Sequence, residues 1–71
     1  MVEIPDSSID RIIRKAGAER VSKSAITVLQ NELEEYGLKI SRVAIEIATY
    51  AGKKTIEDTD ITLALRKIKY P

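Results

Sequence analysis

The 71-residue chain contains neither cysteine nor histidine. Without cysteine it can form no disulfide and no thiolate metal site, and without histidine it lacks another usual zinc ligand and the commonest general base. The chain also has no glycine-rich phosphate loop, no secretory signal pattern after Met1, and no apolar run near the roughly 20 residues of a membrane span. We therefore expect a cytoplasmic protein that is not an enzyme, holds no metal or cofactor, and does not enter a membrane.

Basic charge is concentrated locally, although the net charge is only +1. Residues 11–23 carry a single acid, Glu19, against five cations: Arg11, Arg14, Lys15, Arg20 and Lys23. Lys53 and Lys54 add a basic pair in a predicted loop. Such a local concentration suits an anionic partner. The alternative is that these residues are ordinary solvated charges.

The stretch between Ser22 and Gly52 is predicted to form one long helix. Ser22 is suited to cap its start, and Gly52 to the left-handed position just past its end. A helix of about 28 residues is about 42 Å long, whereas a compact globule of this size is about 30 Å across. Apolar residues recur along it at helical steps of three and four: Ala25, Leu29, Leu33, Tyr36, Ile40, Val43, Ala44, Ile47 and Ala51.

The apolar pattern of this long helix predicts that it packs against a second molecule. Ile26, Leu38 and Ile45 lie off the main stripe, so the helix is apolar on more than one side and needs to be sandwiched. Because the flanking segments can cover only its ends, the middle is left for a second molecule, most simply another copy. Gly37 falls near the midpoint, where two such helices would cross. Alternatively, Gly37 divides the stretch into two shorter helices.

Two shorter helices are predicted to flank the long one. The first spans residues 8–16, is capped by Asp6 or Ser7, and ends at Gly17. Its buried side consists of Ile9, Ile12 and Ile13. The third helix starts between residues 57 and 59 and stops at Tyr70. Its buried stripe consists of Ile61, Ala64, Leu65 and Ile68.

Two connecting segments carry recognisable motifs. Arg11–Ser22 reads RIIRKAGAERVS, and Ala51–Ile56 reads AGKKTI and is followed in register by Asp60 and Ile61. Together with the short–long–short helix order, these motifs make the chain resemble the archaeal histones from about Ile4 to Lys69.

The resemblance implies an all-α histone fold in which residues 1–71 form a single domain. It also implies a homodimer in which two long helices clasp in a handshake. Periodicity alone predicts a partner but does not name this fold. The alternative partner is a related histone, with which the chain would form a heterodimer.

The resemblance further implies binding to double-stranded DNA with little sequence preference. It assigns Arg20 to the minor groove, Thr55 to the support of that arginine from the partner chain, and Lys54 to a phosphate. Arg11 and Arg14 match basic positions on the first helix. Affinity from such contacts is mostly electrostatic and salt-dependent. The alternative for Arg20 is a local pair with its neighbour or plain exposure to solvent.

Further positions are assigned by the same resemblance. Lys53 and Asp60 match a structural ion pair, in which lysine lacks the bidentate fork of the family's usual arginine. Dimers of the family associate through a face that matches Ile47, Tyr50, Asp60 and Leu63. Tyr50 stands where many members carry histidine, so the resemblance does not decide whether the dimers form tetramers and filaments. Glu46 and Glu57 stand where better-known members carry lysine.

The leading prediction is an architectural protein that dimerises, bends or wraps DNA, and compacts the chromosome with which it is associated. The alternative is a histone-fold interaction subunit that caps or modulates histone–DNA assemblies and binds DNA weakly itself. The low net charge, Glu57 and Tyr50 favour that alternative.

Overall fold

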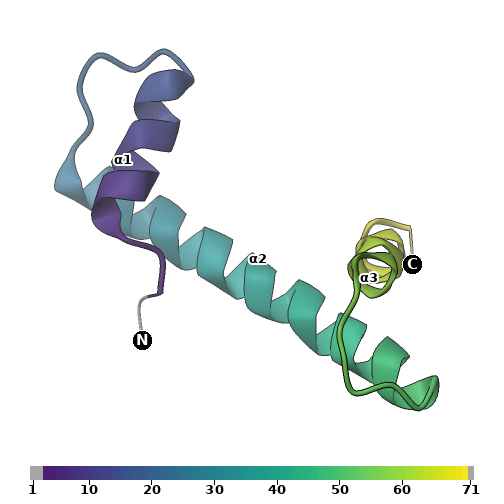
Figure 1. Ribbon diagram of the computed structural model, residues 1–71. Helices are drawn as coiled ribbons and strands as arrows, with labels where there is room; N and C mark the ends of the chain where they lie inside the picture. The colour runs from purple at the N-terminus through teal and green to yellow at the C-terminus, as the bar shows by residue number, and fades with distance from the viewer. Residues whose placement is uncertain (1–2, 71) are drawn as a thin grey trace. The chain divides into compact units, whose positions relative to one another are not determined.

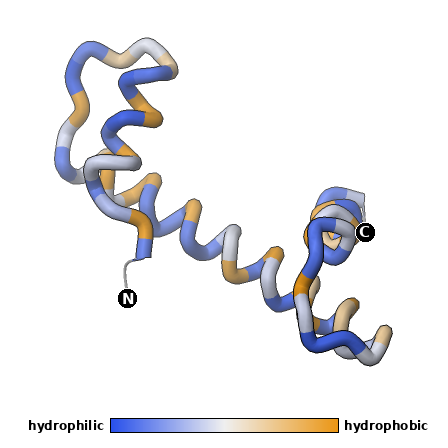
Figure 2. The backbone as a smooth tube through the Cα atoms, viewed as in Figure 1, coloured by the Kyte–Doolittle hydropathy of each residue, from blue (hydrophilic) through white to orange (hydrophobic). Residues whose placement is uncertain are grey.

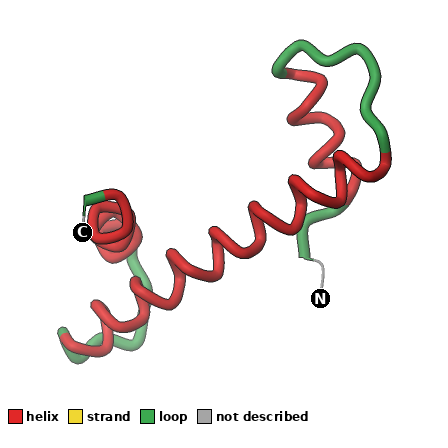
Figure 3. The backbone as a smooth tube through the Cα atoms, turned by 180° about the vertical axis from the view of Figure 1, so that it is seen from behind, coloured by secondary structure: helices red, strands yellow, loops and turns green. Residues whose placement is uncertain are grey.

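The computed structural model describes residues 3–70, which form three helices and, within that range, no strand. Helix α1 spans Asp6–Lys15, α2 spans Lys23–Tyr50 and α3 spans Asp58–Lys69 (Figures 1 and 3). The predicted short–long–short order is confirmed. Within the described range, none of the helices combines the length and the apolar character that crossing a membrane requires.

Helix α2 is continuous over 28 residues, so the alternative of a break at Gly37 was wrong. It begins where predicted, because the backbone N–H of Ala25 donates to Ser22 Oγ at 3.1 Å. It ends where Gly52 adopts a φ of +74°, a conformation that glycine reaches without strain. A Cβ atom built at Gly37 would meet nothing within 4 Å. One copy of the chain therefore gives no steric reason for glycine there.

The chain divides within α2 into two compact units, which we call the first unit (Met1–Glu35) and the second unit (Tyr36–Pro71). In the first unit, α1 packs beside the N-terminal part of α2 (Figure 1). Ile9 is fully buried, while Ile12 remains 51% exposed. The predicted apolar side of α1 is thus only partly covered within the chain.

Helix α1 begins two residues earlier than predicted, and the prediction that Asp6 or Ser7 caps it was wrong. Pro5 occupies the cap position in an extended conformation and makes no side-chain cap bond. Its carbonyl accepts the backbone N–H groups of Ser8 at 3.1 Å and Ile9 at 3.3 Å. Proline suits this start because its own missing N–H removes a donor that the first turn could not satisfy.

Two polar side chains of α2 hold the segment that precedes α1. Gln30 is 3% exposed, and its Nε2 donates to the carbonyl of Ile4 at 2.5 Å and to Asp6 Oδ1 at 2.8 Å. Glu34 accepts the backbone N–H of Ile4 at 2.7 Å and that of Glu3. Asp6 therefore ties α1 to α2 instead of capping α1.

In the second unit, α3 packs beside the C-terminal part of α2 through small side chains. Ala44 and Ala48 of α2 and Ala64 of α3 are buried, and small contact residues allow the shorter interaxial distances seen between helices. Asp60, in the first turn of α3, accepts the backbone N–H of Glu57 at 2.8 Å. The rest of the predicted stripe of α3 is half-buried: Ile61, Leu65 and Ile68.

Both units leave large apolar side chains in contact with solvent. Among the residues that the structure describes, only four apolar ones are fully buried: Ile9, Ala44, Ala48 and Ala64. Apolar segments recur along all of α2 (Figure 2). Among the described residues, the large apolar side chains that are exposed are Ile12, Val28, Tyr36, Leu38, Ile45, Tyr50, Ile56, Leu63 and Tyr70. So much exposed apolar surface on a small chain is typical of an interaction surface.

Candidate nucleic-acid interface

The first loop, residues 16–22, leaves α1 through a backbone turn centred on Gly17. Gly17 has a φ of +119°. Its N–H donates to the carbonyl of Arg14 at 2.9 Å, and that of Ala18 donates to the carbonyl of Ile13 at 3.4 Å. This pair of bonds is the Schellman motif that commonly ends helices. It starts the first loop, whose one cation, Arg20, lies between the end of α1 and the start of α2.

Arg20 lies exposed in the first loop. Over residues 3–70 the ion pairs do not include Arg20, so the alternative of a local pair with Glu19 is absent here. Arg11 on α1 is likewise exposed and outside those pairs. Both guanidinium groups are available to a partner.

Arg14 is different, because its guanidinium is already engaged. Nε donates to Asp10 Oδ2 at 3.0 Å and Oδ1 at 3.2 Å, and Nη1 donates to the backbone carbonyl of Glu19 at 3.0 Å. The side chain therefore bridges α1 and the first loop. The i, i+4 spacing of Asp10 and Arg14 is a sequence signal for their pair, whereas the bond to Glu19 has none.

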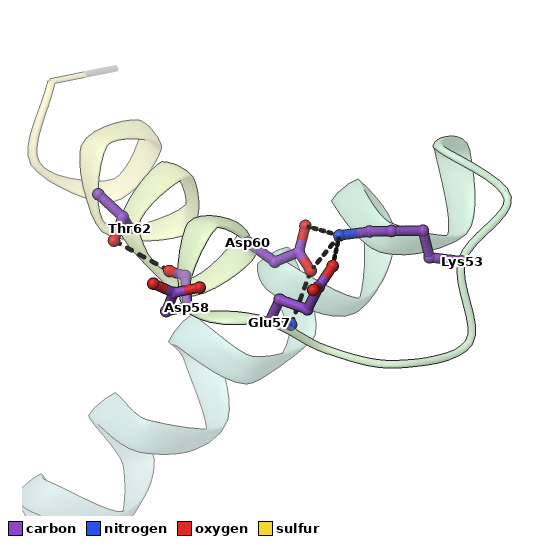
Figure 4. A network of polar contacts seen from close by, with 5 residues as sticks. All are labelled: Lys53, Glu57, Asp58, Asp60 and Thr62. Atoms are coloured by element: carbon purple, nitrogen blue, oxygen red, sulfur yellow. Dashed lines mark hydrogen bonds and ion pairs between the residues drawn. The ribbon is translucent and has the colours of Figure 1, made fainter.

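The second loop, residues 51–57, is held to α3 by a network around Lys53 (Figure 4). Lys53 Nζ lies 2.8 Å from Asp60 Oδ2, 3.0 Å from Asp60 Oδ1 and 2.9 Å from Glu57 Oε1. The structure thus brings together the predicted pair of Lys53 and Asp60. Glu57 is a third member that sequence reasoning missed, and the four-residue spacing was no signal for it because residues 53–57 are not helical.

The network keeps its lysine and its aspartate charged. The hydrogen bond from Lys53, and after it that from the backbone of Glu57, holds the pKa of Asp60 below its ordinary value of 3.8. Hydrogen bonds to Asp60 and then to Glu57 raise the pKa of Lys53 above its ordinary value of 10.5. Lys53 is therefore a cation that is ion-paired with two carboxylates, those of Glu57 and Asp60. Lys54 and Thr55, beside it, are exposed.

The two loops differ in charge only when the adjoining helix ends are counted with them. Residues 14–23 hold four cations and one acid, whereas residues 53–60 hold two cations and three acids. A polyanion is attracted more strongly to the first of these segments than to the second. Among the described residues of the second loop, Lys54 is the cation that takes no part in the Lys53 network.

The residues predicted to join dimers lie in the second unit. Ile47 and Leu63 line a hollow with Arg66, Lys67 and Tyr70, and a second hollow that shares Ile47 and Lys67 includes Tyr50 and Glu46. Three of the four predicted residues thus reach adjoining surfaces. The fourth, Asp60, is 3% exposed and bonded to Lys53 and Glu57. Tyr50 is 96% exposed.

A long central helix flanked by two short ones, with an exposed arginine in the first loop, is the arrangement of a histone-fold protein. The family model described as histone-like transcription factor (CBF/NF-Y) and archaeal histone matches residues 2–65, and the chain belongs to this family. The chain is 48% identical over 66 residues to one of the HAN1 archaeal histone subunits of Thermococcus zilligii, covering 93% of this chain and 98% of the relative.

Two other relatives agree with this membership. Probable archaeal histone 3 of Methanocaldococcus jannaschii is 41% identical over 66 residues, again covering 93% of this chain and 98% of the relative. Histone H4 of Encephalitozoon cuniculi is 36% identical over 69 residues, covering 94% of this chain and 67% of the relative. The histone family is a structural, DNA-binding family and not an enzymatic one. The chain is accordingly a DNA-binding architectural protein in this general sense.

Proposed function

We propose that the chain forms a handshake homodimer that bends and wraps double-stranded DNA with little sequence preference and so compacts the chromosome in the cytoplasm. The observation that carries the proposal is Arg20, an exposed arginine outside the ion pairs of the described chain, in the loop between α1 and α2. All 71 residues act as one histone-fold domain in this dimer.

The exposed apolar surface supports the dimer. Val28 is 64% exposed, Leu38 54% and Ile45 50%, and these side chains are spread along α2. Burying such side chains stabilises an assembly by roughly 25 cal/mol for each Å² of apolar surface removed from water. The open side of the helix at Gly37 leaves room for a second backbone.

The charged side chains support the mode of DNA contact. Arg20 enters the minor groove, where arginine binds without reading a sequence. Arg11 and Lys54 neutralise phosphates, and Thr55 supports Arg20 of the other copy. Lys53 contributes to the stability of the second loop through Asp60.

A binding assay on random-sequence duplex DNA tests the proposal. We expect binding at low salt that Arg20→Ala weakens strongly. Arg42→Ala is the matched control, because it removes one exposed arginine from the surface of α2. Sedimentation of each variant checks that the dimer persists. Failure of the wild type to bind at low salt contradicts the proposal, as does equal binding by the Arg20→Ala and Arg42→Ala dimers.

The second candidate is a protein that caps or modulates histone–DNA assemblies, alone or as a heterodimer with a related histone. The three acids around Lys53 and Lys54 favour it, and so does Tyr50 on the surface that it shares with Ile47. Nuclease protection on long duplex DNA shows whether the Tyr50 face joins dimers. A ladder of regular increments indicates tetramers or filaments that grow through the Tyr50 face, whereas one short footprint indicates dimers only.

A mixing experiment tests the modulating role directly. A capping protein shortens the footprint of a stronger DNA-wrapping histone when the two are combined. An unchanged footprint counts against this second candidate and leaves the architectural role in place.

A further inference from the structure

We infer that Arg14 is a positioning residue, which braces the first loop so that Arg20 is presented to DNA, and that it is not itself a phosphate contact. The inference rests on the proposed function of Arg20 and assigns a different role to its basic neighbour. Its basis is the bridge that Arg14 makes from α1 to the carbonyl of Glu19.

The carbonyl that Arg14 holds belongs to the peptide bond between Glu19 and Arg20. A peptide unit is planar, so fixing its oxygen also fixes the direction of the N–Cα bond of the next residue. The 3.0 Å bond from Arg14 Nη1 to this oxygen therefore restricts where the Arg20 side chain starts. The second support comes from Asp10, which holds Arg14 Nε on the surface of α1.

Little else holds this part of the loop. The Schellman bonds end at Ala18, and the backbone bonds of α2 resume at the carbonyl of Ser22, which accepts the N–H of Ile26. Within the described chain, the bond from Arg14 is the only hydrogen bond to residues 19–21. Val21 adds a half-buried side chain. Loss of the bond should therefore loosen the peptide before Arg20.

The bridge requires an arginine. The planar guanidinium presents several N–H donors in a fixed fork, so one group can face the Asp10 carboxylate and the Glu19 carbonyl at once, whereas lysine has a single nitrogen. The Arg14 side chain is 51% exposed, and such an i, i+4 pair contributes little to stability by itself. Its effect is on geometry. The Asp10 carboxylate also offsets the charge that Arg14 would offer to a phosphate.

Arg14→Lys separates the two roles, because it keeps the charge and removes the fork. If Arg14 braces the loop, Arg14→Lys lowers the affinity for random-sequence duplex DNA about three- to tenfold, the range expected for one hydrogen bond. The same substitution then costs almost nothing in the Arg20→Ala background, because the contact that it positions is already gone. Arg42→Lys, the matched control, leaves the affinity unchanged.

Two results of this assay would overturn the inference. If Arg14→Lys leaves the affinity of the wild-type background unchanged while Arg20→Ala weakens binding, charge alone matters at residue 14. An equal loss in both backgrounds would make Arg14 an independent contact. If Arg20→Ala has no effect on the intact dimer, it is the proposed function that fails.

A measurement without DNA tests separately whether Arg14 restrains the first loop. Backbone NMR order parameters of the full-length protein should fall at residues 19–21 in Arg14→Lys and stay unchanged in α1, α2 and the Arg42→Lys control. Unchanged order at these residues in Arg14→Lys would refute the brace even if the wild-type protein binds DNA as proposed.

Discussion

The salt dependence of DNA binding can be worked out from the ion pairs of the chain. Arg11, Arg20 and Lys54 are predicted contacts outside any ion pair in the described residues, whereas Arg14 is paired with Asp10. Arg20 in the minor groove displaces counterions as the phosphate contacts do, so a homodimer brings six cations to the DNA, and the slope of log K against log[salt] is about −5.4 at about 0.9 per cation. Between about 50 and 200 mM salt the affinity falls about 10³-fold. Arg20→Ala removes two contacts per dimer and reduces the slope to about −3.6.

Fluorescence anisotropy of a labelled random-sequence duplex, titrated at a series of KCl concentrations, measures this slope. Sedimentation at each concentration shows whether the protein stays dimeric. A wild-type slope of about −7 or steeper would mean that Arg14 also neutralises phosphates, which refutes the reasoning that Asp10 withholds it. A slope unaffected by Arg20→Ala would refute the role of Arg20, and Arg42→Ala sets the reference for losing one exposed cation.

Three further predictions concern the polar contacts. Gln30→Ala removes two hydrogen bonds to Ile4 and Asp6 at the start of α1 and should lower the free energy of unfolding by about 2 kcal/mol. Circular dichroism at fixed protein concentration should then show a fall in Tm of about 8–16 °C. A fall of less than about 2 °C would contradict this prediction. Because the pKa of Asp60 is lowered, its stabilisation is present above its ordinary value of 3.8 and is lost as the pH falls through the folded pKa. Melting curves should therefore show an acid loss that Asp60→Asn flattens, and an unaltered acid limb would refute this. Glu57→Gln removes one of the two carboxylates on Lys53 and should raise DNA affinity about two- to threefold, more than the control Glu32→Gln does in the same assay.

Local chemistry made much of the fold predictable. Gly17 and Gly52 mark helix ends because their positive φ belongs to residues just past a helix, and Ser22 caps α2 through a bond three residues along the chain. The apolar spacing of α2 is strong enough that Gly37, which disfavours a helix by about 1 kcal/mol, does not interrupt it. Each of these signals depends on residues within one or two helical turns of each other, so it can be read directly from the sequence.

The start of α1 was not predictable in the same way. Asp6 looks like a helix cap when its neighbours alone are considered. Its carboxylate instead accepts a hydrogen bond from Gln30, 24 residues away. No spacing rule connects two such positions, because their meeting depends on how α1 lies against α2.

For the candidate site, sequence alone determined which residues are basic and which loops hold them. It could also pair Asp10 with Arg14, because four-residue spacing places both side chains on one face of α1. Only the tertiary structure decided which cations stay free. The path of the first loop brings the carbonyl of Glu19 to Arg14, and the close packing of α3 on α2 buries Asp60 beside Lys53. Backbone carbonyls and buried carboxylates leave no mark on a charge pattern, so their partners appear only once the chain has folded.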